Sequence, residues 1–218
     1  AGEVWFDDFA VYELGGADVT TFDGLPVESN VSVASRESGT IYQTQAGLTL
    51  GYHWGEGAVS ALQVNDRELA DATVPSGFLV RDVAKDSDFY GFTGGKCLPL
   101  QLELSAEITA HADHIRISGQ IGDLSGVDRA ITLVFALPVD ATGWMWHDDV
   151  RHSRTIRPKQ EYINGTDIGT GAMGTMSLYP WAVITDDTAG LAIGLDMDLP
   201  GQYRIGYNAG TRQLFIAY

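Results

Sequence analysis

Apolar and polar residues alternate along several stretches of the chain, and a period of two predicts β-strands. The clearest case is residues 100–108, where every second residue is apolar and would lie on one face of a strand. Residues 113–121 follow a similar pattern. Residues 130–139 are almost continuously apolar and β-branched. This predicts a strand buried on both faces, which ends at Pro138.

Turn residues divide much of the remaining sequence into further short extended runs. These runs are residues 40–54, which form two segments separated by Gln-Ala-Gly, and residues 181–184, 191–197, 203–207 and 214–218. Residues 58–70 come nearest to a helical pattern but fit it poorly. A spacing of about ten residues per strand is typical of antiparallel sandwiches. We therefore predict an all-β chain folded as a large antiparallel β-sandwich with one long loop.

The long loop is residues 140–180, which show no clear strand period. Long ordered loops on β scaffolds often carry binding or catalysis. Trp144 and Trp146 would share a face if the chain is extended there, and exposed Trp rings stack on the apolar faces of sugars. The predicted carbohydrate contacts are Trp144, Trp146, Asp148, Arg151, Trp54 and Tyr162. The alternative is that the two tryptophans cap the core.

Residues 151–159 contain four basic residues and no acidic one. They could hold an anionic sugar, because Arg binds carboxylates through two parallel hydrogen bonds. They could equally pair within the protein, with Asp148, Asp149 or Glu161. We favour the internal pairing.

The same region offers a catalytic alternative. Glycoside hydrolysis usually needs two carboxylates, and Asp148, Asp149 and Glu161 are the candidates. Any acidic chain contains such pairs, so this signal is weak. The histidines do not complete a recognised zinc motif, and no nucleotide-binding or nucleophile motif is present. No catalytic residue is therefore assigned.

Composition narrows the possible partners. The chain has 218 residues and a net charge of −16, which argues against nucleic-acid binding. No apolar run is long enough to cross a bilayer, so we expect no membrane partner. The single cysteine, Cys97, excludes a disulfide framework. An acidic chain rich in Asp and poor in Lys is a common composition for a secreted protein, and we expect this location.

Residues 4–14, VWFDDFAVYEL, resemble the last strand of jelly-roll carbohydrate-binding modules. In that family the second Asp of such a run commonly joins a structural calcium site, and Asp8 is the matching position. Calcium at Asp8 is therefore a weak candidate, and no other metal or cofactor is expected. The resemblance assigns residues 1–14 to the terminal strand of a preceding module, or to a tie-in strand. It assigns residues 15–218 to the sandwich domain.

A second resemblance covers most of the remainder, through residues 119–123, 128–140, 143–149, 176–181 and 203–207. These segments are similar to a β-sandwich region of large secreted multidomain glycoside hydrolases, which resembles the supersandwich domain that precedes their catalytic domain. The resemblance implies a supersandwich or jelly-roll-like fold.

It also implies a non-catalytic module of a secreted carbohydrate-active enzyme. Such a module would bind a polysaccharide or oligosaccharide, or brace neighbouring domains of the same polypeptide. The alternatives are a glycoside hydrolase acting through carboxylates of residues 144–167, and a purely structural linker sandwich.

Overall fold

The computed structural model describes residues 21–22, 25–26, 39–165, 180–196 and 203–218. Every helix or strand within those ranges is a β-strand, and all the strand pairs are antiparallel. The described ranges therefore hold no helix that is long and apolar enough to cross a membrane. The predicted fold class, an all-β antiparallel sandwich, is confirmed.

The strands form five sheets. The largest contains, in order, β15 (Glu161–Gly165), β18 (Arg204–Asn208), β19 (Gln213–Ala217), β12 (Ile131–Pro138), β7 (Gly77–Asp82) and β8 (Tyr90–Gly91). A four-stranded sheet contains β14 (Ser153–Thr155), β13 (Met145–His147), β16 (Trp181–Thr185) and β17 (Gly190–Gly194). Another contains β3 (Thr40–Gln43), β4 (Leu48–His53), β5 (Ala58–Val64) and β6 (Arg67–Glu68). A three-stranded sheet contains β11 (Ile115–Asp123), β10 (Leu102–Ala110) and β9 (Lys96–Cys97), and β1 (Thr21–Phe22) pairs with β2 (Leu25–Pro26).

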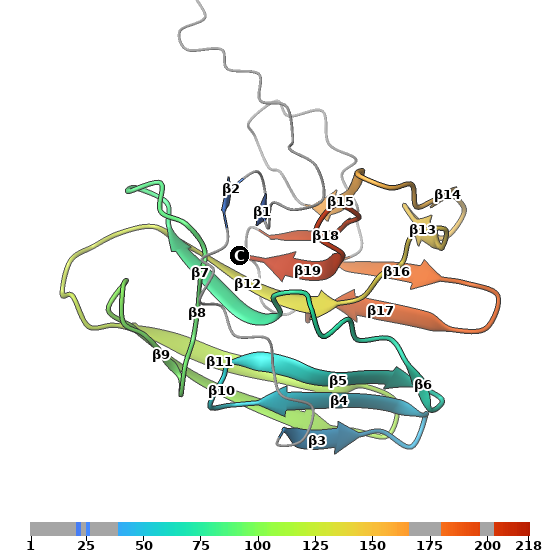
Figure 1. The fold of residues 1–218 in the computed structure, drawn as a ribbon, viewed down its shortest axis with the longest axis horizontal. Helices are drawn as coiled ribbons and strands as arrows, with labels where there is room; N and C mark the ends of the chain where they lie inside the picture. Colours follow the sequence, from blue (N-terminus) through green and yellow to red (C-terminus); the bar gives the residue numbers. More distant parts are fainter. Residues whose placement is uncertain (1–20, 23–24, 27–38, 166–179, 197–202) are drawn as a thin grey trace, which may run out of the picture.

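Figure 1 shows these sheets in two layers. The strands β3, β4, β5, β10 and β11 lie together in the lower half of the view, and β7, β12, β18 and β19 lie above them with β16 and β17. Aromatic rings join the layers, because Tyr52 on β4 contacts Phe78 on β7 at 5.9 Å and Phe135 on β12 at 6.5 Å between centroids. The core therefore lies between the two layers.

Most of the strands predicted from alternation are present. Along β10 the residues at even positions from 102 to 108 are buried or half-buried, and those at odd positions are exposed, as a strand with one buried face requires. The second half of β12 is buried on both faces. Val134 belongs to one apolar cluster, and Leu137 belongs to the main core on the other side.

The long loop is shorter than predicted. Within residues 140–180 the structure contains β13, β14 and β15, and residues 166–179 lie outside the described ranges. These strands are three to five residues long and carry polar side chains, so they have no alternation to detect. The weak helical pattern of residues 58–70 belongs instead to β5 and β6. The strand β7, which lies between β12 and β8, was not predicted from the sequence.

Arginine–carboxylate pairs join separate parts of the chain. The pairs are Arg67–Asp186 (2.6 Å), Arg116–Asp196 (3.1 Å), Arg129–Asp82 (3.2 Å), Arg129–Asp123 (2.6 Å) and Arg212–Asp71. The pair that involves Asp82 is almost fully buried on both sides. Arginine suits these positions because its planar guanidinium can bond several acceptors at once.

Candidate functional site

The two predicted loop tryptophans are core residues. Trp146 on β13 is fully buried, and Trp144 is 8% exposed. They share a face, as their spacing predicts, but this face points into the core. The reason is that this face packs against the largest sheet, where Tyr162 on β15 lies next to the Trp146 ring, and both tryptophans belong to the main apolar core. The burial of both rings agrees with the alternative interpretation, in which the two tryptophans cap the core.

Tyr162 lies in the same buried corner. Its ring centroid is 6.0 Å from that of Trp146, and its hydroxyl accepts the N–H of Arg157 at 2.8 Å. The same hydroxyl lies 3.0 Å from the Thr155 carbonyl oxygen. The structure therefore brings three of the predicted sugar contacts together, but as packed interior side chains.

Asp148 and Arg154 form a two-pronged ion pair at the edge of this corner. The guanidinium donates to both carboxylate oxygens at 2.6 Å, and the Trp146 indole N–H donates to one of them at 3.2 Å. The carboxylate raises the pKa of Arg154. The guanidinium also lies 5.0 Å above the Tyr162 ring. The predicted internal pairing of the basic run is confirmed for Arg154.

Asp149 closes a tight turn with its neighbours. One of its oxygens accepts the backbone N–H groups of Arg151 and His152 at 2.6 and 2.8 Å. The other lies 2.7 Å from Nδ1 of His152. The His152 bond, together with the backbone bonds, lowers the pKa of Asp149 to about 2. A glycosidase general acid needs a raised pKa so that it stays protonated. The lowered pKa of Asp149 instead keeps its carboxylate ionised, which does not suit that role.

The other predicted residues of this region lie apart from one another. Glu161 is exposed on β15, in a different sheet from β13, and accepts a hydrogen bond from the Asn208 amide at 3.2 Å. Arg151 is exposed, and within the described ranges no acceptor of its guanidinium is found. Asp8 lies outside the described residues.

Trp54 is different, because its ring remains partly exposed. It follows β4 in the turn to β5, where Gly57 has a φ of +73° that favours glycine. The indole N–H donates to the Tyr42 hydroxyl at 3.2 Å, and the ring stands edge-on to Tyr52 at 4.7 Å between centroids. Two contacts therefore fix the orientation of the ring while part of it faces solvent.

An open hollow of about 400 Å³ lies beside Trp54. It lies beside the turn at Gly94 and Gly95, which precedes β9. The Gly95 carbonyl accepts the Leu104 N–H at 2.7 Å, and the Gly94 N–H donates to the Gly55 carbonyl at 3.1 Å. The lining residues are Trp54, Gly55, Gly94, Gly95, Leu104, Ser105 and Ala106. Apart from Trp54 and Leu104 they are small, so a planar or ring-shaped ligand could approach the indole.

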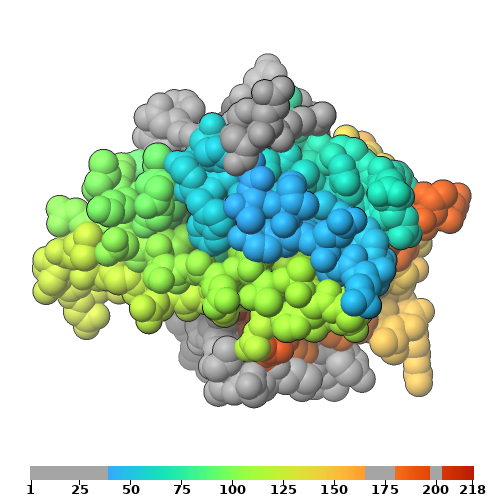
Figure 2. Space-filling view, turned by 90° about the horizontal axis from the view of Figure 1, so that it is seen from below, coloured from blue at the N-terminus to red at the C-terminus, as the bar shows by residue number. Residues whose placement is uncertain are grey.

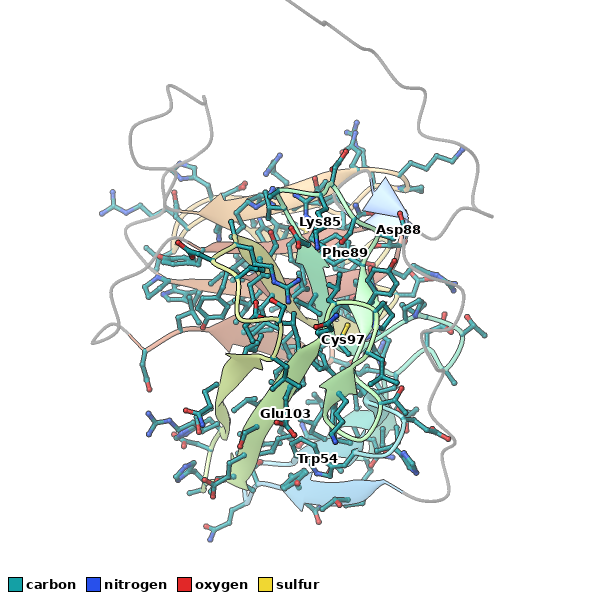
Figure 3. All side chains as sticks on the ribbon, turned by 90° about the vertical axis from the view of Figure 1, so that its left-hand side faces the viewer. Trp54, Lys85, Asp88, Phe89, Cys97 and Glu103 are labelled. Atoms are coloured by element: carbon teal, nitrogen blue, oxygen red, sulfur yellow. The ribbon has the colours of Figure 1, made fainter. Side chains whose placement is uncertain are left out.

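The strands that flank this hollow, β4 and β10, belong to the lower layer (Figure 1). Figure 2 looks onto that layer, and residues of β3 and β4 (blue) lie directly beside those of β10 and β11 (light green). Figure 3 views the end of the molecule that carries β9. There Trp54 lies between Glu103 on β10, above it, and the strand β3, below it.

A second hollow, of about 410 Å³, lies between β6 and the segment that follows β12. It reaches Trp144, but the Arg67 guanidinium lies 5.2 Å above that ring and also bonds Asp186. Its carboxylates are already engaged: Glu68 accepts from the Ala70 N–H, and Asp71 accepts from Thr73. This hollow therefore offers no free aromatic face.

Sequence reasoning selected Trp54 but missed what surrounds it. Tyr42, Gly55, Gly94, Gly95 and Ser105 were not singled out. The only available signals were the glycines next to Trp54 and the Gly94-Gly95 pair, which predict turns and nothing about a ligand. Among the described residues, no group of three His, Cys, Asp or Glu side chains could hold a metal ion.

Comparison with known proteins identifies no relative. No family model matches the chain, and neither a curated protein nor a solved structure matches it significantly. Function is therefore inferred from the geometry of the site.

Proposed function

We propose that this chain is a non-catalytic β-sandwich module of a secreted carbohydrate-active enzyme, and that it binds polysaccharide at the hollow beside Trp54. The observation that carries the proposal is the partly exposed Trp54 ring, held by Tyr42 and Tyr52 beside an open hollow. Sugar rings present apolar C–H faces that stack on such a ring, and nearby polar groups bind the hydroxyls.

The polar groups of the hollow suit this role. Ser105 supplies an exposed hydroxyl. On β10 the N–H of Leu104 points away from β11, toward Gly95. Residues two apart on a strand point their backbone groups the same way, so the N–H and C=O of Ala106 also face away from β11. The hollow therefore combines one aromatic surface with neutral donors and acceptors.

Affinity electrophoresis in gels that contain a panel of soluble polysaccharides tests the proposal. At least one polysaccharide should retard the wild-type protein, and Trp54→Ala should abolish the retardation. Trp54→Phe should keep part of it, because Phe retains an aromatic face. Losing one stacking contact with an aromatic ring costs on the order of 1–3 kcal/mol, or about 5- to 150-fold in affinity.

Trp181→Ala is the matched control, since Trp181 is also partly exposed but lies on β16 in the other layer. It should bind as the wild type does. Circular dichroism should show that each variant is folded. If no polysaccharide retards the wild type, or if Trp54→Ala binds normally, the proposal is wrong.

A second candidate is a structural module that braces neighbouring domains without binding glycan. The burial of Trp144 and Trp146 favours this role for the corner they occupy. Two results together would favour the bracing role over glycan binding. The protein would bind none of the polysaccharides, and it would raise the thermal stability of an adjoining catalytic domain.

A further inference from the structure

The charges around the Trp54 hollow are mostly negative. Glu103 and Glu107 are exposed on β10, on either side of the lining residues 104–106, and Glu56 follows the lining residue Gly55. Two basic side chains neighbour the lining residues in sequence: His53, which precedes Trp54 and lies 3.7 Å from Glu56, and Lys96, which follows Gly95. The strand position of Lys96 is directly opposite Glu103.

The hollow itself contains no basic side chain. Recognition of a carboxylate or sulfate normally uses Arg or Lys, and Arg does so through paired hydrogen bonds. Four arginines, Arg67, Arg129, Arg154 and Arg212, pair with carboxylates away from the hollow. An acidic sugar placed against Trp54 would therefore meet mostly negative charges, and no arginine or lysine among the described lining residues would pair with it.

We infer that the Trp54 hollow selects glycans without acidic groups and rejects those that carry uronate or sulfate. This inference rests on the proposed function, because it concerns the ligand class of the same site. A neutral sugar needs only the indole face and the backbone and hydroxyl groups of β10. The repulsion from Glu103 and Glu107 does not act on it.

The discrimination should depend on salt. Exposed charges act over about 10 Å at 0.1 M ionic strength and over about 30 Å at 0.01 M. At low salt we expect neutral polysaccharides to bind at least about tenfold more tightly than acidic ones, and this ratio should fall as salt is added. Contacts with the indole ring should change little over the same range.

The test compares a neutral polysaccharide that binds with its own carboxymethylated derivative, at low and high salt, by affinity electrophoresis or calorimetry. The two probes share one backbone, so only the added charge differs. The double variant Glu103→Gln/Glu107→Gln should improve binding of the carboxymethylated probe about threefold or more at low salt and leave the neutral probe unchanged.

A control with the same change in net charge is Asp66→Asn/Asp187→Asn. Both residues are exposed in turns away from the hollow, and Asn tolerates the φ of +64° at residue 66. This control should bind both probes as the wild type does. An equal effect of both double variants would show that only the overall charge matters, which would overturn the inference.

The remaining outcomes separate the two proposals. If the acidic probe binds as tightly as the neutral one, or more tightly, and Trp54→Ala abolishes both, the site binds glycan but the inferred selectivity is wrong. If neither probe nor any other polysaccharide binds, the proposed function fails, and the inference fails with it.

Discussion

Removing the hydroxyl of Tyr207 should weaken the fold by an amount that the structure allows to be worked out. Tyr207 on β18 is fully buried, and burial raises the pKa of its hydroxyl. The hydroxyl accepts the Ala141 N–H at 2.8 Å and donates to the Val139 carbonyl at 3.1 Å. Tyr207→Phe therefore leaves two backbone groups without their partner. Because an unsatisfied buried polar group costs about 1–3 kcal/mol, we expect a loss of about 2 kcal/mol in the free energy of unfolding.

Urea denaturation followed by circular dichroism measures this loss. For a protein of this size, 2 kcal/mol corresponds to a fall of about 4–8 °C in Tm. Tyr218→Phe is the control, because Tyr218 is 56% exposed, and a surface change of this kind usually shifts stability by less than about 0.5 kcal/mol. If Tyr207→Phe unfolds at the same urea concentration as the control, the hydroxyl does not hold the segment after β12, and the reasoning is refuted.

Four further substitutions have definite expected outcomes. Gly57→Ala should greatly reduce soluble yield, because φ is +73° and the added Cβ would overlap a backbone carbonyl. Gly94→Ala, whose Cβ meets no atom within 4 Å, should cost only about 1–2 kcal/mol in a denaturation curve. Asp149→Asn should lower the pKa of His152 toward its ordinary value in an NMR titration, since the Asp149 carboxylate raises it. The stability that Asp149 contributes is present above the ordinary carboxyl pKa of 3.8 and is lost as pH falls through about 2. Arg129→Met should lower Tm more at pH 7 than near pH 5, because the Asp82 carboxylate is left buried without its guanidinium partner and protonation relieves that cost. A Tm loss that is independent of pH would contradict this account.

The long strands could be predicted, and the short ones could not. β10 and β12 follow from the order of apolar residues alone, because β10 is long enough for a period of two to appear and β12 is a nearly continuous apolar run. By contrast, β13 and β14 are three residues long and contain polar side chains. β14 pairs with β13, and β13 also pairs with β16, more than thirty residues away. Local sequence contains no information about such a partner.

The candidate site could likewise be predicted only in part. The sequence pointed to tryptophans as candidate contacts, but it does not show which of these side chains are buried. Trp146 is buried because its face of β13 packs against Tyr162 of the largest sheet, whereas Trp54 stays partly exposed because the chain turns there between β4 and β5. The internal pairing of Arg154 could be predicted, because Asp148 is close to it in sequence.

By itself the sequence determined the all-β class, the longest strands and the internal pairing of Arg154. These properties depend on composition and on neighbours within a few residues. The tertiary structure decided which tryptophan keeps an exposed surface, where Gly55, Gly94 and Ser105 come together, and which arginines are already engaged. Those outcomes depend on contacts between segments far apart in the chain, because burial and pairing are properties of the packed layers and not of any single segment.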